Sequence, residues 1–160
     1  NRRHEYTNRE VATLSGLPES TLRYYESIGL LDPVARDESS KHRRYTDDDL
    51  DRILGIACLS ATGLSLDEMR RYLQNGKQGD MAARDQMALL ERHQERLEEE
   101  ARNLELRQRY VTVKIAFWRA VLAGDMQEQA KTRHEAQILA ERLRSLKASS
   151  TRADPGSRRM

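Results

Sequence analysis

The chain has 160 residues, of which 34% are charged and 5% aromatic, and its formal net charge is +2. This length predicts one globular domain, or a small domain with an extended helix, and the composition favours surface helix over a thick core. No apolar run reaches the ~18 residues of a membrane span, and one cysteine excludes an intrachain disulfide. We therefore expect a cytoplasmic protein with no membrane contact.

The first predicted elements are two short helices joined by a turn that contains glycine. Thr7 and Glu10 have the spacing of a capping box, which opens a helix that ends near Gly16. Pro18 leads into a second helix, and Gly29 can adopt the left-handed conformation that ends it. This order is typical of a helix-turn-helix.

The second helix carries side chains that suit contact with DNA. Hydroxyl, guanidinium and phenol groups hold phosphates and reach base edges. We predict a recognition helix whose DNA-binding residues are Ser20, Thr21, Arg23, Tyr24 and Tyr25.

A polar segment over residues 36–45 follows, and it holds a basic cluster closed by an aromatic residue. Its position directly after the predicted recognition helix favours a small hairpin, or wing, whose basic side chains face a phosphate backbone. The alternative is an ordinary solvated loop. The candidate DNA contacts in the wing are Lys41, Arg43, Arg44 and Tyr45.

Two more helices are expected before residue 74. The first begins after Thr46 with a run of acids and ends at Gly63, and the second opens with a capping box at Ser65 and Glu68. With the preceding elements they give an expected DNA-binding domain over residues 5–74.

A sustained heptad pattern then begins, and it predicts a long helix over residues 81–123. Eleven positions from Ala83 to Trp118 alternate in steps of four and three, and nine of them are apolar. A helix over that span is roughly 50 Å long. We call these eleven positions the seam and predict that it forms a dimerising coiled coil; the alternative is packing on the chain's own next helix. The candidate dimerisation residues are Leu90, Leu97, Leu104, Val111, Ile115 and Trp118.

The remaining chain predicts one more helix and a tail. Residues 126–147 carry a thin apolar stripe, and the role of this helix is open. Residues 149–160 are rich in Ser, Thr, Pro, Gly and Arg, so we expect disorder there.

The order of these elements, with three sequence blocks, resembles the MerR family of bacterial transcription regulators. The blocks run from Leu22 to Leu31, from Arg43 to Leu50 and from Thr62 to Met69. The resemblance implies a mainly α fold: an N-terminal winged helix-turn-helix with a small β wing, followed by a long dimerising helix in an antiparallel coiled coil.

The family's activity implies a homodimer that binds promoter DNA and distorts it so that RNA polymerase can engage both promoter elements. We find no nucleophile–base pair, phosphate loop or carboxylate pair in a recognisable motif, so we expect no enzyme activity. A coiled-coil adaptor that does not bind DNA is the alternative from another class.

The inducer is the least determined part of this interpretation. The absence of cysteine after Cys58 excludes a thiolate metal site or an iron–sulfur cluster on the long helix, so we expect no metal and no cofactor. His93 and His134 are interpreted as solvated surface residues.

Cys58 itself lies on the helix after the wing, and its place resembles that of the lone cysteine in the NmlR- and AdhR-like branch, which responds to aldehydes or nitrosative stress. The alternative is a small buried hydrophobe, because no cation stands within four residues of it. A non-covalent inducer is a further possibility, with Tyr110, Phe117 and Trp118 lining a pocket at the dimer interface or simply forming dimer core.

Overall fold

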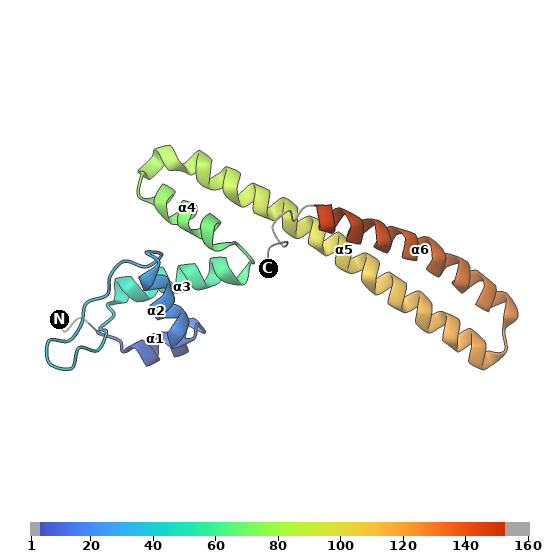
Figure 1. The fold of residues 1–160 in the computed structure, drawn as a ribbon, viewed down its shortest axis with the longest axis horizontal. Coiled ribbons are helices and arrows are strands. Elements are labelled where there is room, and N and C mark those ends of the chain that lie inside the picture. The colour runs from blue at the N-terminus through green and yellow to red at the C-terminus, as the bar shows by residue number, and fades with distance from the viewer. Residues whose placement is uncertain (1–3, 153–160) are drawn as a thin grey trace, which may run out of the picture. The chain divides into compact units, whose positions relative to one another are not determined.

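The computed structural model describes residues 4–152, without the side chains of residues 80, 81 and 147–152. The described residues form six α-helices and one short 3₁₀ helix (Figure 1). They divide into two compact units, one up to His93 and one from Gln94 onward. The elements are α1 (Asn8–Ser15), α2 (Glu19–Ser27), α3 (Asp47–Ala61), α4 (Leu66–Gly76), η1 (Gly79–Ala82), α5 (Ala83–Ala123) and α6 (Met126–Arg152).

The helices of the first unit begin where the capping residues predict. The Thr7 hydroxyl accepts from the Glu10 N–H at 3.2 Å, and Thr46 forms a complete capping box with Asp49. At the end of α2, Gly29 has φ 75°. The Leu30 N–H donates to the Tyr25 carbonyl at 2.9 Å, which closes the helix with a Schellman motif.

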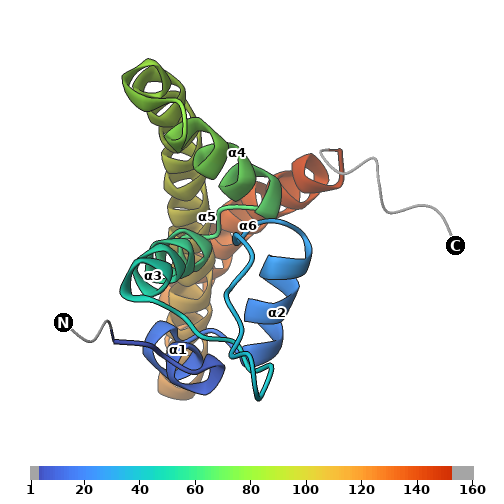
Figure 2. The same cartoon turned by 90° about the vertical axis from the view of Figure 1, so that its left-hand side faces the viewer.

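One apolar core holds the first unit together. Each of α1, α2, α3 and α4 contributes side chains to it, and α5 contributes Leu89 from its first turns. Because these residues come from every helix of the unit, the core fixes α2 against the other helices (Figure 2). Its most completely buried members are Val11, Leu22, Tyr45, Ile53, Ile56 and Met69.

The predicted β wing is present as a short hairpin rather than as regular strands. Within the described residues it is held by an isolated antiparallel bridge between Arg36 and Arg43, and a second bridge joins Tyr6 to Tyr45. The Arg44 N–H donates to the Ala35 carbonyl and the Asp37 N–H donates to the His42 carbonyl, both at 2.8 Å.

In the second unit, α6 packs antiparallel along α5 (Figure 1). Its core is narrow and built mostly from small residues: Ala120 of α5 is buried, and so are Thr132, Ala136 and Leu139 of α6. The helix α6 continues to Arg152, past the expected end at residue 147, so residues 149–152 are helical rather than disordered. The rest of the expected disordered tail, residues 153–160, lies outside the described residues.

The seam and the α6-packing face lie on opposite sides of α5. On α5, Tyr110 and Phe117 line a cavity with residues of α6. The partly buried Leu106 and Val113 and the buried Ala120 lie on the same side of the helix, in one row with them. At about 100° per residue, the seam positions fall on the side of the helix roughly 180° from this row. They remain exposed, for example Leu97 at 38% and Val111 at 56%. The alternative that α6 covers the seam is therefore wrong.

The interpretation of His93 as solvated surface is also wrong. Its side chain is only 7% exposed, and Nε2 lies 2.8 Å from the Thr62 carbonyl oxygen at the end of α3. It helps to fix the start of α5 against the α3–α4 turn. His134 is exposed as expected. Within the described part of the chain there is no helix long and apolar enough to cross a bilayer, and there is no cluster of metal-ligating side chains.

Candidate nucleic-acid interface

A cleft of about 470 Å³ lies between the starts of α1 and α2 and the wing. We call it the basic groove. Of the residues that line it, Glu19 is the only acidic one. Clustered guanidinium and ammonium groups give such a cleft a positive potential that attracts phosphate. The seven basic or imidazole side chains that line it are Arg9, Arg23, Arg36, Lys41, His42, Arg43 and Arg44.

The helix α2 divides its predicted contact residues between two faces. Ser20, Arg23 and Tyr24 are exposed, and Thr21 is half-buried. Tyr25 is only 7% exposed and belongs to the core. Adjacent residues on a helix point about 100° apart, so one of two neighbouring tyrosines faces inward. The expectation that Tyr25 presents its ring to DNA is therefore corrected.

Tyr45 is likewise a core residue. Its side chain is completely buried, and its hydroxyl donates to Asn8 Oδ1 at 2.8 Å. Burial raises the pKa of the Tyr45 phenol, since the phenolate would lack water. The residue joins the base of the wing to α1, and it leaves no surface for a DNA contact in this conformation.

Arg43 links the wing to the recognition helix. Its Nε lies 2.7 Å from Glu26 Oε2, and both side chains are 17% exposed. A partly buried, charge-assisted hydrogen bond of this kind fixes geometry strongly. Arg43 lines the basic groove, but its pairing makes it a positioning residue for the wing as well as a candidate phosphate contact.

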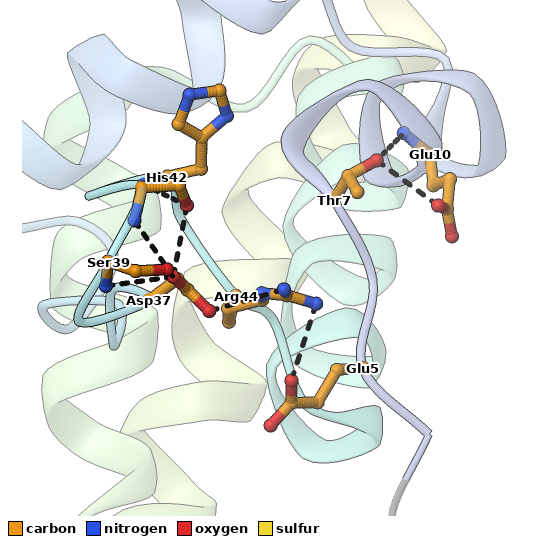
Figure 3. A network of polar contacts seen from close by, with 8 residues as sticks. Glu5, Thr7, Glu10, Asp37, Ser39, His42 and Arg44 are labelled. Atoms are coloured by element: carbon orange, nitrogen blue, oxygen red, sulfur yellow. Dashed lines mark hydrogen bonds and ion pairs between the residues drawn. The ribbon is translucent and has the colours of Figure 1, made fainter.

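The tip of the wing is organised around the carboxylate of Asp37 (Figure 3). Asp37 Oδ1 accepts from the Ser39 hydroxyl at 2.6 Å and from the Ser40 N–H at 2.9 Å. These hydrogen bonds, the Ser39 hydroxyl first, hold the pKa of Asp37 far below its usual value. Lys41 then takes a left-handed φ of 61°, and its carbonyl accepts from Arg36 Nη1 at 3.1 Å.

Arg44 is held at the base of the same turn. Its guanidinium lies 3.3 Å from Asp37 Oδ2 and 3.6 Å from Glu5 Oε2 (Figure 3). Lys41 and His42 are exposed at the tip. The wing therefore presents Lys41 and His42 outward, on a turn whose backbone is held by the Asp37 carboxylate.

Three residues of this interface do not stand out in the sequence. Arg9 follows an ordinary helix cap and Arg36 sits in a polar run, yet both line the basic groove. In the sequence, Glu26 has the pattern of a solvent-exposed acid, yet in the structure its ion pair with Arg43 holds the wing against α2. The sequence shows only that charges are frequent around α2 and the wing, and it does not reveal which of those charges meet.

The candidate sensor Cys58 lies on α3 and is exposed. The alternative that it is a small buried hydrophobe is therefore wrong for the single chain. The aromatic cluster on α5 is divided: Tyr110 and Phe117 line a small cavity of about 170 Å³ against α6. Trp118 is 58% exposed and lies on the seam.

Comparison with known proteins gives consistent results. Residues 6–76 match the model of the MerR HTH family regulatory protein. An HTH-type transcriptional regulator of Haemophilus influenzae is 31% identical over 118 residues, which are 74% of this chain and 87% of that protein. The regulator AdhR of Bacillus subtilis is 35% identical over 88 residues, 55% of this chain and 62% of AdhR.

Among solved structures, the chain is similar to HiNmlR, a MerR family regulator that lacks the sensor domain and was crystallised bound to promoter DNA. The TM-score is 0.64 at 31% identity, and the alignment covers 76% of this chain and 92% of that one.

Proposed function

This chain belongs to the MerR family of transcription regulators, and from that premise we propose that two copies of it bind and distort promoter DNA. Family membership sets aside the alternative of a coiled-coil adaptor. The observation that carries the proposal is the basic groove, in which recognition helix and wing present cations around one cleft.

The proposed contacts follow from exposure. Arg23 and Tyr24 are the exposed side chains of α2 that can enter a major groove, with Ser20 and Thr21 at its start. Arg9, Lys41 and Arg44 are proposed to hold phosphates on either side. Tyr25 and Tyr45 support the interface from within the core and are not proposed as contacts.

Dimerisation is supported by the exposed seam. Leu90, Leu104 and Ile115 are each between 39% and 49% exposed, on the face of α5 that α6 leaves open. A mostly apolar seam on a helix about 61 Å long needs a partner, because heptad side chains interlock only with a second such seam. We propose that the partner is a second copy of the chain.

A dimer also accounts for distortion. In a dimer the two recognition helices are held at a fixed distance. If the half-sites of the DNA are spaced differently, binding must bend or twist the duplex, and the free-energy cost of that distortion depends on how deformable the DNA sequence is. That the similar protein HiNmlR was crystallised bound to promoter DNA supports promoter DNA as the ligand. We propose that the distorted promoter is what RNA polymerase engages.

Cys58 is the proposed sensor of a thiol-reactive inducer, and its exposure supports this. The thiolate adds to an aldehyde carbonyl to form a C–S bond, and the thiol proton ends on the former carbonyl oxygen as a hemithioacetal. Nothing leaves, so the step needs no further reactant. The added group sits on the exposed side of α3. Because α3 packs against α1 and α4, and α1 packs against α2, we propose that the group changes how α3 is held and, through α1, how the recognition helix is presented.

The test of DNA binding uses a duplex enriched by the protein from a random-sequence library, measured at two salt concentrations. Arg23→Ala is expected to weaken binding by about 1–3 kcal/mol for each half-site and to relax base preference. Lys41→Ala is expected to weaken binding evenly across sequences and to lower the salt dependence by about one phosphate contact.

The matched control is Arg71→Ala, since Arg71 is an exposed cation on α4 outside the groove. It should bind like wild type. If Arg23→Ala and Lys41→Ala also bind like wild type, the groove is not the interface.

The sensor is tested separately with Cys58→Ala. This variant is expected to keep DNA affinity but to lose the transcriptional response to formaldehyde or to a nitric oxide donor. Mass spectrometry of the treated wild type should find the adduct on Cys58. A full response in the variant would show that the inducer acts elsewhere.

A further inference from the structure

A second cavity of the first unit lies at the opposite end of α2 from the basic groove. It has a volume of about 710 Å³ and is formed by the C-terminal end of α2 with parts of α3 and α4. It shares no lining residue with the groove. Its size falls within the roughly 300–1,000 Å³ of small-molecule sites. We call it the rear pocket.

One part of the rear pocket is apolar and preformed. Leu30, Leu31 and Ile56 line it and are buried members of the core, so their positions are fixed by packing. Ile28 and Leu73 are only partly buried and pack against the same core. They offer an apolar ligand accessible surface on a rigid base.

Another part of the rear pocket is cationic. Arg52, Arg70 and Lys77 line it with a single carboxylate, that of Asp32. Arg52 Nη1 lies 2.9 Å from Asp32 Oδ2, and Lys77 Nζ lies 3.9 Å from Asp32 Oδ1. Two cations therefore share one acid, and the set carries an excess of positive charge.

Arg70 has separate partners: its Nη1 lies 3.9 Å from Asp67 Oδ1, and a second contact is at the end of α2. Its Nη2 donates to the Ile28 carbonyl at 3.3 Å. The C-terminal end of a helix carries partial negative charge and repels anions. Because Arg70 offsets that charge, Arg52 and Lys77 remain as the pair that can receive an incoming carboxylate.

We propose that the rear pocket binds a hydrophobic monocarboxylate. Its carboxylate pairs with Arg52, which suits two-point recognition, and with Lys77. Its apolar body lies along Ile28 and Leu73. The local charge favours an anion over a neutral analogue of the same shape and repels a cationic one.

Such a ligand would contact the end of the recognition helix and α4 together, and so would bias how α2 is held. This regulatory consequence rests on the proposed DNA-binding function. The binding itself does not, and it gives the chain a non-covalent effector site distinct from Cys58, which does not line the pocket.

Binding is tested by calorimetry on the full chain with three probes of one shape: 2-naphthoate, neutral 2-naphthol and cationic 2-naphthylmethylammonium. Naphthoate is expected to bind tightest, naphthol about tenfold more weakly because it lacks the charged pairing, and the cation not measurably. If naphthol binds as tightly as naphthoate, the proposal is wrong.

Two variants locate the site. The double change Arg52→Gln and Lys77→Gln removes both partners and should weaken naphthoate binding by about a hundredfold, with naphthol nearly unaffected. Leu73→Trp fills the apolar part and should weaken both. Arg71→Gln, on the same helix but outside the pocket, is the matched control.

Unchanged naphthoate affinity in the double variant would place the probe elsewhere, for example on the exposed seam, and would overturn the proposal. If Leu73→Trp fails to fold by circular dichroism, the double variant decides, because Arg52 and Lys77 are exposed.

DNA binding is measured in parallel. If the protein binds naphthoate but no duplex, only the proposed DNA-binding function is refuted. If it binds a duplex but no naphthoate, only the rear-pocket proposal is refuted.

Discussion

The two units of this chain differ in how much of their apolar surface they bury. The first unit folds around its own core, in which Val11, Leu22 and Tyr45 are fully buried. The second unit buries little beyond Ala120, Ala136 and Leu139 and leaves a row of large apolar residues exposed. The first unit is therefore stabilised by contacts within the chain, whereas the second has a face that only another surface can cover. The difference separates the part that positions the groups proposed to contact DNA from the part proposed to pair two copies.

The difference between the units is tested most directly by placing charges on the seam. The double change Leu97→Glu and Leu104→Glu places four buried carboxylates in the proposed dimer, and we expect dimer affinity to fall at least about a thousandfold. Analytical ultracentrifugation measures it. The fold should remain, since both residues are exposed in the single chain.

Glu105→Gln, on a flank of the same helix, is the control and should leave the dimer intact. A seam variant that sediments like wild type would refute dimerisation through this face.

The first unit is tested at Tyr45. Tyr45→Ala removes a completely buried ring and should lower the free energy of unfolding by about 3–5 kcal/mol. Tyr45→Phe loses only the hydrogen bond to Asn8, at about 0.5–1.5 kcal/mol. Urea unfolding gives both values. If Tyr45→Ala were as stable as wild type but bound DNA weakly, Tyr45 would be a contact rather than a core residue.

The attachment of the wing is tested at Glu26. Glu26→Gln weakens the 2.7 Å pairing with Arg43, and we expect a loss of about 1–3 kcal/mol in unfolding free energy. DNA affinity should fall as well, because the wing is less firmly placed against α2. A double-mutant cycle with Arg43→Gln measures the coupling. Additive effects would show that the two side chains do not cooperate.

The smallest expected effect is that of pH on the wing tip. The pKa of Asp37 is lower in the folded state than its ordinary value of about 3.9. Its stabilising contribution is therefore complete above that value and is lost as the pH falls. The stability difference between wild type and Asp37→Asn should be present at pH 7 and shrink by pH 3.

Glu38→Gln, an exposed neighbour on the wing, should show no such trend. A wild-type advantage over Asp37→Asn that stays constant from pH 7 to pH 3 would show that the Asp37 carboxylate does not act through its charge.

Local signals in the sequence predicted the elements well, because caps and periodicity act over a few residues. Thr7, Thr46 and Ser65 begin helices as expected, and Gly29 ends α2. The side-chain roles were harder to predict. Tyr25, Tyr45 and His93 carry polar groups that are common at surfaces, yet each is buried. Tyr25 packs in the common core, whereas Tyr45 and His93 contact Asn8 and Thr62, which are 37 and 31 positions away. Cys58 is the opposite case: an apolar helix face favours burial of its side chain, yet the structure exposes it.

The family, the winged helix-turn-helix and the heptad seam can be predicted from the amino-acid sequence alone, since each depends on short-range spacing along the chain. Three features required the three-dimensional structure: which cations share the basic groove, that α6 leaves the seam open, and that the far end of α2 joins α3 and α4 around a cationic rear pocket. Those results depend on residues tens of positions apart, which the core of the first unit brings together around the groove and the pocket, and the α5–α6 packing brings together in the second unit.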